Sequence, residues 1–342
     1  MISLGRFPQW QRPPPLFSGT QCRADVYLVT PDSKMRTSYP RYRCIARLEP
    51  NAKQALIVLL IIFSPVASFG DQITSGTIIV IAQTKRSVII AGDSRAGETN
   101  DGITITSTND CECKLAALGG NTAFAAAGVI GNREKHWKAA SEAANARAAT
   151  IRGDAPIGSS DGDLILKRWA ESMMNKLSDF STQSLIAVAN ANKGRITTGV
   201  LAGVEADGSV WIHDVAISFS SVVGLSYQGH TLTSNDPPTA YYFLGKSEIG
   251  MEFEEFKTSE RSIRERARWS RLKLKGRAFD RFKTRRLVEL TIEFHPDKSE
   301  VGGKVDEIEL DSKGVRWTSL KKNCQQGDAI APPTKARAEC RP

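Results

Sequence analysis

The chain has 342 residues, of which 41% are hydrophobic and 24% are charged. This balance argues against wholesale disorder, and the length suffices for one large domain or two ordinary ones. The net charge of +9 says little about partners, because residues 1–76 hold 9 Lys and Arg against 4 Asp and Glu, which leaves only 37 against 33 for the rest.

Residues 1–70 are predicted to form a leader and not a domain. Residues 1–54 are rich in Pro and Arg without periodicity, and an apolar run follows at 55–63. That run is shorter than the ~20 residues needed to span a bilayer. It lies between basic residues and a small-residue exit, which is the pattern of a secretory signal peptide, and Met35 would serve as a normally placed start. We expect a periplasmic or secreted protein; the alternatives are a membrane-anchored or a cytoplasmic protein, in which 55–63 is an uncleaved anchor or a buried strand.

Four of the six cysteines follow this leader, at positions 111, 113, 324 and 340. An even number fits two disulfides outside the cytoplasm. Cys111-Glu112-Cys113 is a weak metal motif, because no second pair at zinc spacing accompanies it. The four histidines are scattered, and we interpret them as structural or surface residues. We therefore expect a structural disulfide or plain thiols, and neither a metal nor a cofactor.

The predicted elements form clusters of strands and of helices. A polar linker at 71–76 precedes apolar, β-branched runs at 77–83 and 86–92, a loop or loose strand pair at 95–110, and a second hairpin from 113–119 and 121–128. Helices are predicted at 133–151 and 164–177, strands at 184–191, 197–205 and 209–218, and a loop at 225–240. Helical regions at about 250–275 and 279–294, a closing hairpin from 304–310 and 315–320, and a disordered tail at 324–342 complete the chain. Such clustering favours antiparallel sheets packed against helices, which is an α+β fold.

Two spacings connect polar residues to these strands. Gly76-Thr77-Ile78-Ile79-Val80 opens the first run, and Thr77 lies sixteen residues before Asp93 at the end of the second. Lys114 lies fourteen residues before Gly128, which ends the second hairpin. These residues and the order of elements resemble proteasome β subunits and the bacterial HslV-type peptidase. The resemblance is good over 76–132, fair over 133–220, and faint over 280–320, where Val301-Gly302-Gly303 matches the family's pair of glycines before a closing strand.

The resemblance implies a fold and a mechanism. The fold would be the four-layer αββα sandwich of the N-terminal-nucleophile (Ntn) hydrolases, spanning 77–323 with a basic insertion at about 250–280. Thr77, freed by autocatalytic or signal-peptidase processing of a short propeptide at 71–76, would be the nucleophile, and its own α-amine would be the base. Lys114 would lower the pKa of that amine by like-charge repulsion, Asp93 would pair with Lys114, and the backbone N–H of Gly128 would stabilise the oxyanion, a contribution of ~3 kcal/mol in comparable sites.

In the family a serine and an aspartate near the last helix support the threonine amine, together with another serine. The candidates in this chain are Asp297 and Ser299 for the first pair and Ser247 for the other serine.

The expected activity is that of a threonine-type endopeptidase or amidohydrolase acting on a peptide or amide substrate, and the resemblance implies a homo-oligomer. The alternatives are a small-molecule amidase on the same fold and a non-catalytic proteasome-like assembly or binding protein. Residues 257–286 hold 13 Lys and Arg against 3 Asp and Glu, with aromatic residues between them. Such charge runs favour a solvated helical insertion over a binding surface, and no nucleic-acid partner is expected. Contact with a membrane is expected only through the leader.

Overall fold

The computed structural model describes residues 72–76, 78–102, 104–110, 112–232, 239–254 and 258–319. The chain divides into units 1–68 and 69–342, and all described residues belong to the second unit. The predicted leader with its apolar run at 55–63, the predicted tail at 324–342, and Thr77 lie outside the described residues. Within the described part, no helix is long and apolar enough to cross a membrane.

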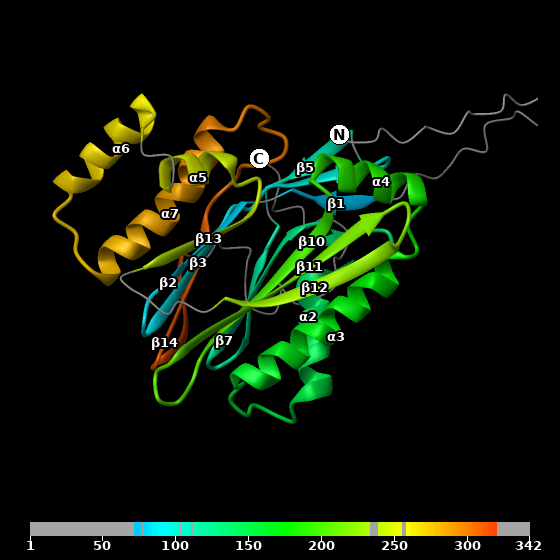
Figure 1. The fold of residues 1–342 in the computed structure, drawn as a ribbon, viewed down its shortest axis with the longest axis horizontal. Coiled ribbons are helices and arrows are strands. Elements are labelled where there is room, and N and C mark those ends of the chain that lie inside the picture. Colours follow the sequence, from blue (N-terminus) through cyan, green and yellow to red (C-terminus); the bar gives the residue numbers. More distant parts are fainter. Residues whose placement is uncertain are drawn as a thin grey trace, which may run out of the picture. The chain divides into compact units, whose positions relative to one another are not determined.

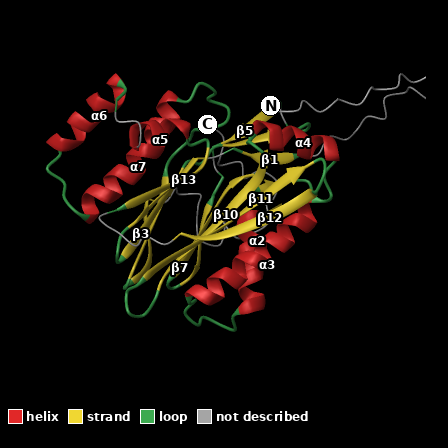
Figure 2. Ribbon diagram, viewed as in Figure 1, coloured by secondary structure: helices red, strands yellow, loops and turns green. Residues whose placement is uncertain are grey.

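The described residues form a mixed fold of helices and antiparallel sheets, as the clustering of elements predicts (Figure 2). The helices are α2 (Ala139–Thr150), α3 (Ser159–Leu177), α4 (Thr182–Ala191), α5 (Glu248–Glu254), α6 (Glu260–Arg271) and α7 (Arg277–Phe294). The strands belong to three sheets, and each pairing between neighbouring strands is antiparallel.

The first sheet has the order β13-β2-β3-β14-β15, with β2 at Ile78–Gln83, β3 at Ser87–Gly92, β13 at Ala240–Gly245, β14 at Asp306–Asp311 and β15 at Gly314–Ser319. The second sheet has the order β12-β11-β10-β7-β6, with β6 at Leu115–Gly119, β7 at Thr122–Gly128, β10 at Arg195–Val204, β11 at Val210–Ser220 and β12 at Gly224–Leu232. The third, smaller sheet has the order β5-β4-β1-β8-β9, with β1 at Ile73–Ser75, β4 at Ala96–Thr99, β5 at Ile105–Asn109, β8 at Gly131–Asn132 and β9 at Trp137–Lys138.

Strand β2 shows how the layers are held together. Successive side chains of a strand point to opposite faces of its sheet. Ile79 and Ile81 belong to the apolar cluster that joins the first sheet to strands β6, β7 and β10 of the second, whereas Ile78 and Val80 pack with α7. Both faces of β2 are therefore buried, which explains its uninterrupted apolar sequence. A further apolar cluster, containing Trp169 of α3, covers the outer face of the second sheet, where α2 and α3 lie in Figure 1.

Most of the predicted elements are confirmed. Both early hairpins form, as β2–β3 and β6–β7, and so do the closing hairpin β14–β15 and helices α2, α3 and α7. Residues 95–110 contain the two short strands β4 and β5. The helical region predicted at about 250–275 is divided between α5 and α6.

Three predictions are wrong. Residues 184–191 form most of α4 and not a strand, because Ser181 caps a helix by accepting a hydrogen bond at 3.1 Å from the N–H of Ser184. The predicted loop at 225–240 contains most of β12. The polar sequence of this strand has no local strand signal, and the strand forms because its neighbour β11 supplies the backbone hydrogen bonds. The predicted linker at 71–76 contains β1, in which Ile73 is fully buried.

Candidate active site

Asp93 follows β3, and its carboxylate is enclosed by three donors. Oδ1 accepts hydrogen bonds from the backbone N–H of Ile78 at 3.0 Å and from Nζ of Lys114 at 2.9 Å. Oδ2 accepts from the backbone N–H of Gly302 at 3.0 Å. The side chain has no exposed surface. A buried carboxylate is tolerated only when its charge and its hydrogen bonds are satisfied, and these three donors satisfy both.

Lys114 precedes β6, and its side chain is 1% exposed. Besides the bond to Asp93, its ammonium donates to the backbone carbonyl of Arg95. The predicted pairing of Asp93 with Lys114 is therefore confirmed. A buried ion pair of this kind is weak evidence for stability alone.

The segment around Gly302 forms hydrogen bonds with Asp93 and with the two residues that follow it. Gly302 donates its N–H to Asp93, and its carbonyl accepts from the N–H groups of Ser94 at 3.2 Å and Arg95 at 3.0 Å. The hydroxyl of Ser94 accepts from the N–H of Lys304 at 2.9 Å. The glycine pair singled out in the sequence thus lies beside Asp93, but its role as a backbone donor to the carboxylate was missed, because nothing in the sequence shows a contact over 209 residues.

The side chain of Arg95 stabilises the backbone turn that follows Asp93. Its Nε and Nη2 donate to the two carboxylate oxygens of Asp110 at 2.5 and 2.6 Å, and its Nη1 donates to the carbonyl of Lys298. The hydrogen bonds that Arg95 donates to Asp110 raise the pKa of Arg95 above its ordinary value. These hydrogen bonds fix the backbone at Arg95, whose carbonyl accepts the hydrogen bond from Lys114.

Thr77 is not among the described residues, but both of its neighbours in the chain are. Ile78 donates its N–H to Asp93, as described above. Gly76, which has a φ of +97°, lines a cavity of about 160 Å³ together with Gly128. The residues on either side of Thr77 therefore contact the Asp93–Lys114 pair and the cavity at Gly128.

Strand β1, just before Gly76, lies between two other strands. It pairs antiparallel with β4 on one side, where Thr74 opposes Glu98, and with β8 on the other, where Thr74 opposes Gly131. The N–H of Ile130 donates to the carbonyl of Thr74 at 2.9 Å. The segment before Thr77 is thus held by backbone pairing on both sides.

Gly128 ends β7 in a conformation that favours glycine. Its φ is +91°, and a Cβ there would lie 2.9 Å from the Cα of Thr197 and closer still to the carbonyl oxygen of Ile196. The next residue, Val129, donates its N–H to that same carbonyl at 2.9 Å. A side chain at position 128 would therefore displace backbone that is held on both sides.

The three candidate supporting residues lie in two places. The Oδ1 atom of Asp297 accepts from the hydroxyl and the N–H of Ser299 at 2.6 and 2.8 Å, and these bonds lower the pKa of Asp297. Ser247 lies after β13, and its hydroxyl donates to Sδ of Met251 at 3.4 Å. Asp297 and Ser299 thus bond to each other, whereas Ser247 lines the larger cavity described next.

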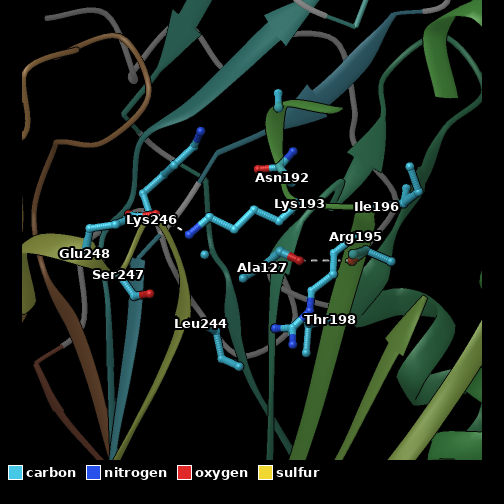
Figure 3. A pocket seen from close by; sticks show the side chains of 14 residues that line it. Ala127, Asn192, Lys193, Arg195, Ile196, Thr198, Leu244, Lys246, Ser247 and Glu248 are labelled. Carbon is cyan, nitrogen blue, oxygen red and sulfur yellow. Dashed lines mark hydrogen bonds and ion pairs between the residues drawn. The ribbon is translucent and has the colours of Figure 1, made fainter. Parts of the chain in front are cut away.

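A larger cavity of about 350 Å³ also reaches Gly128 (Figure 3). Its walls come from the end of α4, the turn into β10, the beginning of β10, and the connection from β13 to α5. The lining residues are Ala127, Gly128, Ala191, Asn192, Lys193, Arg195, Ile196, Thr197, Thr198, Leu244, Gly245, Lys246, Ser247 and Glu248. Sequence reasoning missed this cavity, because its walls are far apart in the chain.

The remaining motifs have structural roles. Cys113 is buried and disulfide-bonded, which agrees with the expected structural disulfide. Within the described ranges, no group of three or more His, Cys, Asp and Glu residues could hold a metal ion. His213 is buried, with ring nitrogens 2.8 Å from the carbonyl of Ser159 and 3.0 Å from the hydroxyl of Thr231.

Many cations of the basic region 257–286 are engaged within the fold. Arg277 pairs with Glu309 and Asp311 of β14, and Arg281 pairs with Glu307 at 2.6 Å. On the helices, acids likewise hold basic side chains: Arg261, Arg264, Lys283, Arg285 and Arg286. These contacts agree with a helical region in which much of the charge is satisfied internally.

The chain was also compared with known proteins. No model of a known protein family matches it, and no curated protein is detectably similar.

Proposed function

We propose that this protein is an Ntn hydrolase related to proteasome β subunits, and that Thr77 at its mature N-terminus cleaves amide bonds of peptides. One observation carries the proposal. The buried Asp93–Lys114 pair is hydrogen-bonded to Ile78, the residue next to Thr77. The two facing antiparallel sheets with helices outside each of them support an αββα sandwich of the Ntn type.

The proposed hydrolysis uses a free amine and a hydroxyl that belong to the same residue, Thr77. The α-amine of Thr77, with an ordinary pKa near ~8, takes the proton of the hydroxyl, which attacks the substrate carbonyl. The ammonium of Lys114 lowers the pKa of this amine by repulsion and keeps it able to accept a proton. The N–H of Gly128 faces the oxyanion of the tetrahedral intermediate. Collapse of this intermediate breaks the C–N bond, the leaving amine takes the proton, and water hydrolyses the remaining ester.

The same hydroxyl releases Thr77 from its precursor, in which the nitrogen of Thr77 is still an amide and cannot be the base. The hydroxyl adds to the carbonyl of Gly76, its proton passes to the nitrogen as the C–N bond breaks and frees the amine, and water hydrolyses the resulting ester. Gly76 and Gly128 line one cavity, so the bond to be cleaved is close to the proposed oxyanion donor. Residues 71–76 are accordingly the propeptide, which remains after a signal peptidase has removed the leader.

Strand β1 favours a peptide substrate over a small amide. It precedes the proposed scissile bond and pairs with β4 and β8. Once β1 leaves, an extended substrate peptide can take its place and form the same backbone hydrogen bonds. A small amide without a backbone would leave these groups unpaired. We further propose that the protein is exported and forms a homo-oligomer, as the leader and the resemblance imply.

Peptide hydrolysis by the full-length protein tests the proposal. We expect a panel of fluorogenic peptides to include substrates, a threonine-reactive inhibitor to stop their hydrolysis, and Thr77→Ala to abolish it. The matched control is Thr108→Ala, which removes an exposed threonine of β5 and should retain activity. Hydrolysis that survives Thr77→Ala would exclude Thr77 as the nucleophile. Turnover of small amides without any turnover of peptides would favour the small-molecule amidase.

A further inference from the structure

The larger cavity adjoins the one at the proposed scissile bond. Five residues line both cavities: Gly128, Ala191, Asn192, Gly245 and Lys246. Only the smaller cavity is also lined by Ser75 and Gly76, which precede the scissile bond. The lining of the larger one includes Gly128 but no described residue of β1. The residues that follow the cleaved bond of a substrate therefore have room in the larger cavity.

Three cations line this cavity: Lys193, Arg195 and Lys246. Figure 3 shows the side chain of Lys193 reaching across the cavity toward Glu248, and the guanidinium of Arg195 beside Thr198. The cations come from opposite walls, since Lys193 and Arg195 precede and begin β10, whereas Lys246 follows β13. A ligand between these walls would meet positive charge from both sides.

Two of the three cations have acidic partners. Lys246 is paired with Glu300 at 3.1 Å, and their side chains are 22% and 27% exposed. Lys193 is 3.6 Å from Glu248, with side chains 87% and 61% exposed, so that solvent weakens this pair. Lys193 can therefore exchange Glu248 for another anion, whereas Lys246 stays paired with Glu300.

The backbone N–H of Arg195 donates to the carbonyl of Asn192 at 3.1 Å, but its guanidinium makes no hydrogen bond or ion pair with the part of the chain that the structure describes. Its charge acts on Asp214: burial raises the pKa of Asp214, and His230 and Arg195 partly offset this effect. Asp214 is itself within 3.4 Å of His230. Arg195 thus presents a guanidinium to the cavity, and a guanidinium matches the two oxygens of a carboxylate with parallel N–H donors.

We propose that the larger cavity binds a carboxylate of the substrate on the leaving-group side of the cleaved bond, with Arg195 as its main ligand and Lys193 as the second. This inference rests on the proposed function and adds a substrate preference to it. The carboxylate belongs either to an aspartate or glutamate side chain shortly after the cleaved bond or to the C-terminus of the peptide. The lining also holds polar side chains and one acid, Glu248, so three cations face one carboxylate and the net positive charge favours an anionic ligand.

Cleavage-site profiling of a complex peptide library by mass spectrometry tests this preference. One half of the library carries free C-termini and the other half amidated C-termini. Enrichment of aspartate and glutamate within three residues after the cleaved bond in both halves identifies an acidic side chain as the ligand. Enrichment of short C-terminal fragments only in the free-acid half identifies the terminal carboxylate.

Variants of Arg195 provide the decisive comparison. For a favoured peptide and its neutral counterpart, such as an aspartate-to-asparagine pair, we expect a ratio of kcat/KM of about 10 to 100, the range of a hydrogen bond between charged groups. Arg195→Gln should bring this ratio close to one, and Arg195→Glu should favour lysine at the same position. The control is Arg152→Gln, which removes an exposed arginine outside the cavity and should keep the ratio.

The possible failures are distinguishable. Cleavage by the wild-type protein without a preference for carboxylates, or a preference that Arg195→Gln leaves intact, overturns the carboxylate site but not the hydrolase. Absence of cleavage of every peptide, in a protein that is folded by circular dichroism, overturns both.

Discussion

Replacing Asp93 with asparagine keeps the shape of the side chain but removes its charge from a fully buried pair. The carboxylate accepts from Ile78, Lys114 and Gly302. An asparagine has one oxygen, so if that oxygen keeps the first two donors, its NH₂ group faces the third donor. The ammonium of Lys114 then stays buried but loses the negative charge of Asp93. Breaking a buried pair in this way costs about 3–5 kcal/mol of folding free energy.

Lys114→Met tests the same pair from the other side. It retains most of the apolar stem and leaves the Asp93 charge with two backbone donors, so we expect a loss of similar size. The double variant leaves no unpaired charge. Its loss should therefore fall short of the sum of the two single losses by about 1–3 kcal/mol. Urea unfolding followed by circular dichroism measures all three values, because folded domains have ~5–15 kcal/mol of stability to lose.

An exposed pair on α3 is the matched control. Lys167 and Asp163 are 2.7 Å apart, but their side chains are 52% and 46% exposed. Asp163→Asn and Lys167→Met should show a far smaller coupling, because solvent screens the exposed pair. If the losses from Asp93→Asn and Lys114→Met add to within about 0.5 kcal/mol, the two side chains do not interact and the description of the site is refuted.

Three further substitutions probe other parts of the structure. Gly128→Ala combines a positive φ with a clash against backbone, so it should destabilise the fold by about 2–4 kcal/mol and stop processing. Its control is Gly208→Ala, where φ is +84° but the added Cβ meets open space; this variant should lose only about 1–2 kcal/mol of stability in the same urea titration. Gly76→Ala would place a Cβ 2.7 Å from the carbonyl oxygen of Glu300, so intact-mass spectrometry should show unprocessed chain accumulating; processing at the wild-type rate would contradict this. Arg277→Met removes a cation from two buried acids of β14 and should lower stability by about 1–2 kcal/mol, less so in high salt; an identical loss at all salt concentrations would argue against an electrostatic role.

The sequence predicts well those elements whose signals are local. The β-branched run at 78–83 alternates between two buried faces, and the apolar positions of α7 recur at helical spacing. By contrast, the residues of α4 include Leu185, Ile186 and Val188, an apolar cluster that also suits a strand. The deciding signal was the serine cap at Ser181, one residue before the helix.

Elements that depend on distant partners could not be predicted in the same way. β1 has three residues and forms because β4 and β8 pair with it, and β12 is largely exposed and forms because it pairs with the edge of β11 opposite β10. Within the site, the spacing of Asp93 and Lys114 indicated their pairing only through the family resemblance. The N–H of Gly302 and the guanidinium of Arg195 join the site through long-range folding, which leaves no local pattern.

The mature N-terminus is the most direct measurement of the central claim. The full-length protein is produced in a host that exports it, and the purified product is analysed by intact-mass spectrometry and N-terminal sequencing. We predict that the wild-type chain begins at Thr77 and that Thr77→Ala retains the residues that precede it. A wild-type chain that is folded and begins at any other residue would contradict the account.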